Sequence, residues 1–217
     1  MPMDVHPLGD RGFLIRFESE DEAARWSAEM GKSQWPEVID VVLAYSSVAI
    51  YVDPDLTDWV EFEARLRNLK VSSKALQSGR RICLPVLYDG ADLEDAAQLL
   101  GLTPAELISR HCGQDYHVFA LGFQPGFPYA GYLPDSLAGL VRRKTPRLKV
   151  PAGSVAIVGR QTGIYPAESP GGWHLLGRTP MQVVDVTDKY FPIQAGDLLR
   201  FVPISSEDYA SRLGDRL

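Results

Sequence analysis

One stretch of the chain, residues 119–180, is unusually rich in glycine, proline and aromatic residues. It contains the blocks Gly122-Phe-Gln-Pro-Gly-Phe-Pro-Tyr129 and Glu168-Ser-Pro-Gly-Gly-Trp173. Proline fixes φ and lacks an N–H donor, and glycine readily takes φ > 0, so we expect neither a continuous helix nor a central strand in these blocks. Disorder is not expected either, because the aromatic side chains would be left in water. A long ordered loop region of this kind predicts a functional site.

The composition is that of a globular protein. The chain has 217 residues, of which 45% are hydrophobic, so it can build a sizeable core as one domain or two. It has no apolar run of transmembrane length, and its first residues do not resemble a signal peptide, so we expect a soluble, cytoplasmic protein with no membrane partner. In that compartment Cys83 and Cys112 are expected to stay reduced.

Charge is unevenly distributed along the sequence. Residues 1–79 carry 14 acidic and 8 basic side chains, whereas residues 116–184 carry seven lysines and arginines against only Asp135 and Glu168. A basic region within an acidic protein favours a small anionic ligand, a phosphate or an acidic partner surface. The net charge of −6 and the lack of a basic helix argue against nucleic acid as a partner.

The first third of the chain predicts a small α+β domain. Hydrophobic patterning indicates strands at 12–17, 38–44 and 48–51 and helices at 21–30 and 55–70, the second capped by Asp55 or Thr57. This order is typical of a ferredoxin-like sandwich, with residues 80–87 as its last strand or as the crossover. The polar stretch 71–79 is the best candidate for a linker.

The remainder of the chain changes from helices to short strands. Helices are predicted at 92–100 and 103–112, the latter with Thr103 as its cap and Pro104 in the first helical position. Strands are predicted at 116–121, 154–158, 181–185 and 198–203. Because turn residues separate these strands, the pattern indicates a β-barrel or a β-sandwich.

Several ordered blocks carry a family resemblance. They are Gly122–Tyr129, Thr145-Pro-Arg147, Val150-Pro-Ala-Gly-Ser154, Gln161-Thr-Gly-Ile-Tyr-Pro166, Glu168–Trp173, Gly177-Arg-Thr-Pro180 and Gly196-Asp-Leu-Leu-Arg-Phe-Val-Pro203. Over nearly its full length the chain resembles the family of allophanate hydrolase subunit 1 and the B subunit of 5-oxoprolinase, which includes a sporulation kinase inhibitor. The resemblance implies an α+β protein with an N-terminal ferredoxin-like domain at 1–79 and a C-terminal cyclophilin-like β-barrel at 80–217.

The resemblance also implies a function. The chain would be a subunit of an ATP-dependent 5-oxoprolinase, which hydrolyses 5-oxo-L-proline to L-glutamate using ATP with Mg²⁺. It would act with a homologous second barrel subunit and a ring-opening subunit, and would be inactive alone. The alternative is a non-enzymatic inhibitor that binds the dimerisation domain of a sensor histidine kinase. A prolyl isomerase is a third possibility that rests on fold analogy alone.

Two residues are candidates for proton transfer. His111, at the end of the second predicted helix of the barrel region, is either an acid or base reaching the site or a histidine that complements the helix dipole. Glu168 lies between two prolines and is either a base or ligand-amide acceptor, or a structural carboxylate that accepts backbone N–H groups.

The candidate binding residues lie in the same region. Arg147, with its basic neighbours, suits a carboxylate or phosphate, although each cation could equally be solvated. Gln161, Thr162 and Tyr165 suit an amide or lactam, or serve only the turn. Phe127 and Tyr129, with Phe123, either line an apolar groove or plug one end of the barrel.

Several familiar motifs are missing from the sequence. There is no phosphate-binding loop with its lysine, no dinucleotide fingerprint and no nucleophile elbow. His117 and His174 show no metal-site spacing with either cysteine, so no metal centre is predicted. If ATP is used, we expect it to be bound by an unfamiliar loop arrangement or shared with a partner chain.

Overall fold

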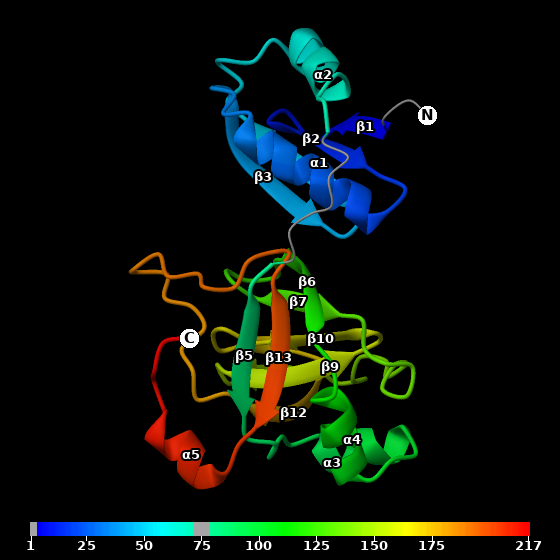
Figure 1. Cartoon of the computed structure of the whole chain (residues 1–217), viewed down its shortest axis with the longest axis vertical. Coiled ribbons are helices and arrows are strands. Elements are labelled where there is room, and N and C mark those ends of the chain that lie inside the picture. The colour runs from blue at the N-terminus through cyan, green and yellow to red at the C-terminus, as the bar shows by residue number, and fades with distance from the viewer. Residues whose placement is uncertain (1–3, 72–78) are drawn as a thin grey trace. The chain divides into compact units, whose positions relative to one another are not determined.

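The computed structural model describes residues 4–71 and 79–217. The chain divides into two compact units, residues 1–77 and 78–217 (Figure 1). Most of the predicted linker, 71–79, lies outside the described residues. Within the described part of the chain, no helix is long and apolar enough to cross a membrane.

The first unit is a four-stranded antiparallel sheet with two helices. The strands lie in the order β1-β2-β4-β3. Its elements are β1 (Asp4–Pro7), β2 (Gly12–Arg16), α1 (Glu20–Lys32), β3 (Val38–Ala44), β4 (Ser47–Val52) and α2 (Trp59–Arg67). Both helices bury side chains against the sheet, because Trp26 of α1 and Phe62 of α2 belong to the same core cluster as Phe13 and Ile50.

The start of α2 corrects the sequence prediction. The helix begins at Trp59 rather than at residue 55, and its cap is Asp58, whose side chain accepts the N–H groups of Val60 and Glu61. The hydroxyl of Thr57 instead donates to the carbonyl of Asp53 at 2.6 Å. Two further capping candidates lie just before Asp58, so sequence alone did not identify the one that turns toward the helix.

The second unit contains the remaining elements. Seven of its strands form one sheet in the order β5-β13-β6-β7-β10-β9-β12, and β8 pairs with β11 separately. The elements are β5 (Arg81–Val86), α3 (Leu93–Leu99), α4 (Pro104–His111), β6 (Tyr116–Leu121), β7 (Pro128–Gly131), β8 (Arg147–Val150), β9 (Ser154–Val158), β10 (Gln161–Ile164), β11 (Ser169–Gly171), β12 (His174–Arg178), β13 (Leu198–Pro203) and α5 (Ser206–Ser211).

The pairing of β5 overturns one expectation. β5 runs parallel to β13 in register from Arg81↔Leu198 to Val86↔Pro203, so it is not the last strand of the first unit. Just after β5, Leu87 forms an antiparallel bridge to Arg178 with two backbone hydrogen bonds of 2.9 Å. This bridge links the first strand of the seven-stranded order to the last.

The predicted helices of the second unit are present. α4 starts as expected, because the Thr103 side chain accepts the N–H of Glu106 and the Glu106 carboxylate accepts the N–H of Thr103. Leu93 of α3 and Leu107 of α4 pack into the large core cluster of this unit, together with Tyr116 of β6.

The region 119–180 contains more regular strands than its glycine and proline content predicted. It contains β7, β10 and β12, which are interior or terminal strands of the sheet and are only four or five residues long. Short strands fit between the glycines and prolines, which is why a prediction of loops was wrong for this part. Residues 181–185, in contrast, do not form the predicted strand. Asp185 there makes a turn, bridging to Tyr190 and accepting the N–H of Thr187.

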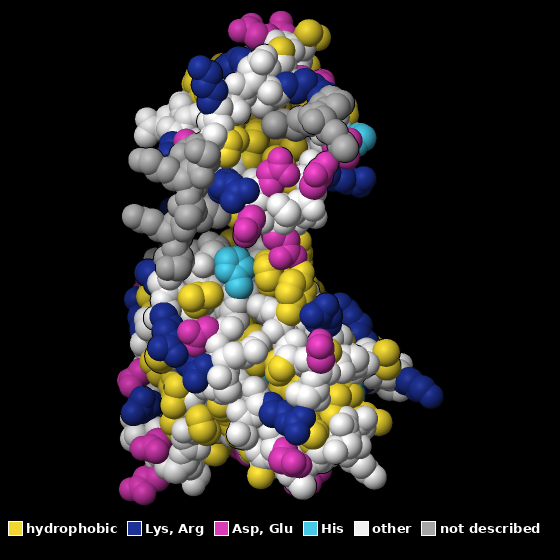
Figure 2. All heavy atoms as spheres, turned by 45° about the vertical axis from the view of Figure 1, so that its right-hand side comes forward, with side chains coloured by type: hydrophobic (Ala, Val, Ile, Leu, Met, Phe, Trp, Pro, Cys, Tyr) yellow, Lys and Arg dark blue, Asp and Glu magenta, His cyan; other side chains and the backbone are white. Residues whose placement is uncertain are grey.

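Figure 2 shows how charge is distributed over one face of the molecule. Lysine and arginine side chains lie among aspartates and glutamates on both units, with hydrophobic side chains between them. No single-sign surface dominates this face.

We predict that Gly177→Ala destabilises the second unit by about 1–3 kcal/mol. A Cβ at Gly177 would lie 2.4 Å from the carbonyl oxygen of Leu87, at the bridge between β5 and β12. Gly172→Ala is the matched control, because the nearest atom to its Cβ would be a side-chain carbon of Pro146 at 3.7 Å, an ordinary contact distance. Urea unfolding measures both changes, and equal midpoints for the two variants would contradict the prediction.

Candidate functional site

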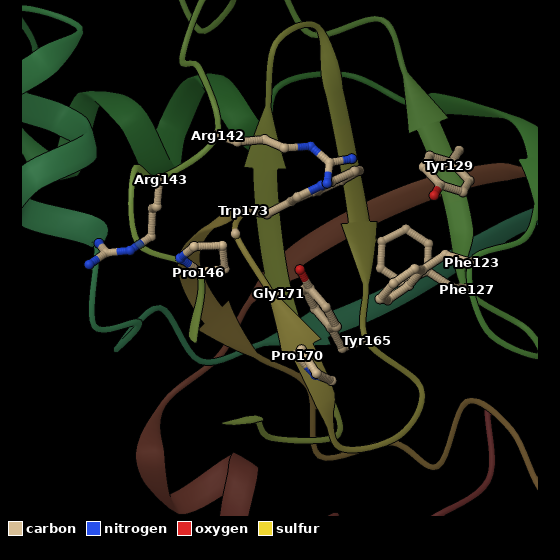
Figure 3. Close-up of a pocket in the computed structure, with 11 residues that line it drawn as sticks. Phe123, Phe127, Tyr129, Arg142, Arg143, Pro146, Tyr165, Pro170, Gly171 and Trp173 are labelled. Atoms are coloured by element: carbon tan, nitrogen blue, oxygen red, sulfur yellow. The ribbon is translucent and has the colours of Figure 1, made fainter. Parts of the chain in front are cut away.

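A cavity of about 280 Å³ opens within the second unit (Figure 3). Its wall combines aromatic rings, glycine and proline backbone and two arginines. The lining residues are Phe123, Phe127, Tyr129, Arg142, Arg143, Pro146, Tyr165, Pro170, Gly171, Gly172 and Trp173. We call this cavity the aromatic pocket.

The rings of the aromatic pocket are the outer edge of a packed cluster. Phe127, Tyr165 and Trp173 are buried, and the Phe127 ring lies edge-on to both of the others at centroid distances of 5.2 and 5.3 Å. Tyr129 meets Phe127 and Trp173 in the same way. Edge-to-face pairs stabilise one relative orientation of the rings, so the pocket wall is preformed. Phe127 and Tyr129 therefore line a pocket and at the same time pack into the buried cluster behind it.

Phe123 differs from the other rings because it is 62% exposed. Its φ is +69°, in the left-handed region that a non-glycine residue rarely adopts. The following turn is held by hydrogen bonds, since the Gly122 N–H donates to the Phe127 carbonyl at 3.1 Å. A large apolar side chain presented in a strained backbone conformation is typical of a binding site.

Two neighbouring arginines have different surroundings. In Figure 3 the Arg142 side chain reaches over the pocket beside Trp173, whereas Arg143 points away from it. The Arg143 guanidinium donates instead to the carboxylate of Asp92. Arg142 is therefore the cation available to a ligand in the aromatic pocket.

Asp92 organises this part of the unit. Its side chain is 1% exposed and accepts from Arg143, from both terminal nitrogens of Arg147 at 2.7 and 2.8 Å, and from the Leu175 N–H at 2.8 Å. Burial acts to raise the pKa of Asp92, but these hydrogen bonds and the two guanidinium charges hold the pKa below its ordinary value. The carboxylate therefore stays charged and ties the segment 143–147 to Leu175 of β12.

The sequence analysis missed Asp92. It lies at the start of a predicted helix, where an aspartate usually serves as a cap. In the structure it occupies that position without making a capping hydrogen bond. The signal that could have revealed it is the excess of arginine in a region with almost no acids, since buried cations require a partner.

His111 lies in the core rather than in the aromatic pocket. It is completely buried, and its Nδ1 is 2.7 Å from the hydroxyl of Tyr88 while its Nε2 is 2.9 Å from the hydroxyl of Thr162. The Thr162 hydroxyl donates to the carbonyl of Ala156, so it accepts from Nε2–H, and Nδ1 accepts from Tyr88. Burial lowers the pKa of His111 to about 3, so the ring is neutral and does not complement the helix dipole with a charge.

The other predicted residues fall into four groups. Tyr165, Phe127 and Tyr129 line the aromatic pocket. Gln161 and Thr162 lie on β10, where Thr162 faces the core. Arg147 is held by Asp92 and does not line the pocket. Glu168 is exposed, and its carboxylate lies 3.0 Å from Nζ of Lys149, also exposed.

The chemistry available in the aromatic pocket is that of binding. Among its described lining residues there is no carboxylate, histidine, serine or cysteine. Within residues 4–71 and 79–217, no group of three or more acidic, histidine or cysteine side chains is placed to hold a metal ion. The pocket offers a flat apolar wall, the Arg142 guanidinium and glycine backbone, which suit a small planar anion.

Comparison with known proteins identifies the family of the chain. The chain belongs to the family described as carboxyltransferase domain, subdomain C and D, which matches residues 3–192. Within that class it belongs with the proteins named as the B subunit of 5-oxoprolinase. It is 34% identical over 227 aligned positions to the Bacillus subtilis protein of that name, covering 94% of each chain, and 41% identical over 209 positions to the Haemophilus influenzae protein, covering 92% of this chain and 97% of the other.

Solved structures share the fold. The crystal structure of TTHA0988 matches with a TM-score of 0.81 and 34% identity over 90% of this chain, which spans only 40% of that larger chain. The conserved protein PH0987 from Pyrococcus horikoshii matches with a TM-score of 0.56 and 35% identity over 95% of this chain and 100% of its own. The K. lactis urea amidolyase, at 17% identity and a TM-score of 0.74, shares the fold alone.

We predict that Asp92→Asn destabilises the second unit by about 1.5–3 kcal/mol, because two half-buried guanidinium groups and the Leu175 N–H lose a charged acceptor. The control is Asp89→Asn, which removes an exposed partner of Arg178 and should cost less than about 1 kcal/mol. Urea unfolding provides the measurement. A loss at Asp92 no larger than at Asp89 would rule out the organising role.

We also predict a pH dependence of stability from His111. Its pKa in the folded chain, about 3, lies below the ordinary value of 6.5, so the unfolded chain binds the proton first. The contribution of the neutral His111 to the free energy of unfolding is therefore fully present above about pH 6.5. As the pH drops below that value, the free energy of unfolding falls by up to about 1.4 kcal/mol per pH unit.

His111→Gln should flatten this dependence between about pH 6.5 and 4.5, whereas His6→Gln, at an exposed position, should not. The slope of unfolding free energy against pH is the measurement, and it does not depend on how stable the variant is at pH 7. An unchanged slope in His111→Gln would show that another group is responsible.

Proposed function

We propose that this chain is the B subunit of an ATP-dependent 5-oxoprolinase and that the aromatic pocket binds 5-oxoproline. One observation carries the proposal: a free guanidinium, that of Arg142, reaches over a small pocket walled by aromatic rings (Figure 3). The chain's similarity over most of its length to proteins named as that subunit supports the same assignment.

The chemistry of 5-oxoproline matches the pocket. The molecule is a five-membered lactam ring that carries a carboxylate. The ring would lie against the aromatic wall formed by Phe123, Tyr129 and Trp173, and the carboxylate would pair with Arg142 in bidentate fashion. A cavity of about 280 Å³ suits a ligand of this size better than a longer peptide.

The reaction requires activation of the lactam. Amide resonance makes the ring carbonyl a poor electrophile, so transfer of the ATP γ-phosphoryl group to the carbonyl oxygen creates a leaving group. Water can then add to the ring carbon, the ring C–N bond breaks, and phosphate and glutamate are released. In this scheme the chain's own residues bind and orient the lactam and exclude water from one face of the ring.

The described pocket wall supplies no carboxylate, histidine or lysine for proton transfer, only the hydroxyls of Tyr129 and Tyr165, so we propose that the active site is shared. A homologous second barrel subunit would face the pocket, and a ring-opening subunit would complete the reaction. Glu168 remains a candidate for proton transfer, since the Gln124 amide donates to the carbonyl of Ala167 at 3.5 Å and joins its loop to the Phe123 turn. His111 would act as a positioning residue through Thr162.

We further propose that the two units are the domains expected from sequence. The sheet order β1-β2-β4-β3 with two helices supports a ferredoxin-like domain at 1–79. The seven-stranded order, together with the Leu87–Arg178 bridge between its first and last strands, supports a cyclophilin-like barrel at 80–217. The kinase-inhibitor alternative stays a prediction, and a direct binding assay with a kinase dimerisation domain tests it.

We predict that Arg142→Gln raises the KM for 5-oxoproline about tenfold or more, because a hydrogen-bonded charge partner of the carboxylate is lost. Arg110→Gln, an exposed arginine of α4 outside the aromatic pocket, is the matched control. The assay is glutamate release from 5-oxoproline and ATP by the chain co-expressed with its partner subunits. An unchanged KM in Arg142→Gln would remove Arg142 from the site.

The same complex tests the other candidate residues. Loss of turnover in Glu168→Ala with an unchanged KM would place Glu168 in the chemical step. Arg147→Ala should act through folding, because Arg147 contacts Asp92 rather than the pocket. The purified chain alone should not hydrolyse ATP in response to 5-oxoproline, and such activity would refute a shared site.

A further inference from the structure

A second cavity, of about 520 Å³, lies in the same unit along residues 139–145. It is lined by Leu99, Gly139, Leu140, Val141, Arg142, Arg143, Lys144, Thr145 and His174. Arg142 and Arg143 also line the aromatic pocket, so the segment that carries them borders both cavities. We call this second cavity the basic cavity.

The charge of the basic cavity is uncompensated. Arg143 is paired with Asp92, but among residues 4–71 and 79–217 no carboxylate lies within ion-pair distance of Arg142 or Lys144. No acidic side chain of the described chain lines the cavity. Two free cations beside a concave surface create a positive potential that attracts an anion.

The cavity also presents apolar surface to solvent. Val141 is 80% exposed and Leu99 is 67% exposed. Exposed aliphatic side chains beside free cations fit a ligand that joins a flat apolar group to an anionic one. An inorganic anion would use only half of this surface.

His174 adds a polar feature to the wall. It is 6% exposed, and its Nε2 lies 2.9 Å from the carbonyl of Val141, so Nε2 carries the proton and donates. Its Nδ1 is then an acceptor, and it has no partner among the described residues. His174 thus fixes the Val141 carbonyl at the cavity wall, while its buried Nδ1 is not presented to a ligand.

We propose that the basic cavity binds the nucleotide, with the phosphates on Arg142 and Lys144 and the base against Leu99 and Val141. The inference rests on the proposed function, which requires ATP. Arg142 would then stand between the two ligands, at the position where charge develops as the terminal phosphoryl group passes to the lactam oxygen. In that step the bond from phosphorus to the bridging oxygen breaks, the bond to the lactam oxygen forms, and ADP leaves.

The test is calorimetric titration of the isolated full chain with ATP and Mg²⁺, adenosine and inorganic phosphate. ATP should bind more tightly than either fragment, because it alone uses both halves of the cavity. Lys144→Gln should weaken ATP binding about tenfold, and Arg142→Gln with Lys144→Gln about a hundredfold. Lys32→Gln, a surface lysine of α1, should leave it unchanged. Lys144 is exposed, so its loss should not affect folding.

The outcomes separate this inference from the proposed function. No ATP binding by the isolated chain, or binding that Lys144→Gln leaves intact, overturns the inference. Phosphate binding as tightly as ATP also overturns it, because the cavity is then a general anion site. If the assembled complex still releases glutamate in these cases, the proposed function stands. ATP binding at this cavity in a complex that does not act on 5-oxoproline would support the inference and contradict the proposed function.

Discussion

The buried carboxylate of Asp92 is the interaction on which the site depends. An unpaired charge in the interior costs several kcal/mol, so Asp92 is stable there only with the donors around it. Those donors come from places far apart in sequence: two arginines near β8 and the backbone of Leu175 in β12. One carboxylate therefore holds the segment 143–147 against β12. The neighbouring Arg142 forms no ion pair with a carboxylate of the described residues, so its charge is available to a ligand.

A second constraint is that successive residues of β10 point to opposite faces of the sheet. Thr162 turns to the core and accepts from His111, while Gly163 turns to the opposite face, where a Cβ would lie 2.9 Å from the Phe127 ring. The polar network of the core and the aromatic cluster of the pocket thus lie on opposite faces of one short strand, β10. A neutral His111 suits this arrangement, because a charged ring would need a partner that the core does not provide.

Sequence reasoning succeeded where the pattern was local. The strands at 38–44, 154–158 and 198–203 and the Thr103 cap follow from hydrophobic period and capping chemistry, and the structure has them. It failed where contacts between residues far apart in sequence determine the structure. The strands β7, β10 and β12 each contain a glycine, which sequence patterning treats as a break, and Asp92 resembles an ordinary cap until its distant arginines are seen. Of the residues predicted to bind a ligand, the aromatic ones line the pocket, because ring-dense turns must pack somewhere.

The parallel pairing of β5 with β13 has a consequence for biosynthesis. Arg81 pairs with Leu198, so the backbone groups of β5 have no ladder partner until more than a hundred further residues have left the ribosome. Chains are made from the N-terminus at roughly 5–20 residues per second, and this pairing has to wait for that interval. Within the first unit, the pairings of β1 with β2, β2 with β4 and β3 with β4 join residues within 4–52 and do not have to wait in this way. Until β13 has been made, β5 lacks this partner, and an unpaired strand edge invites association with other chains.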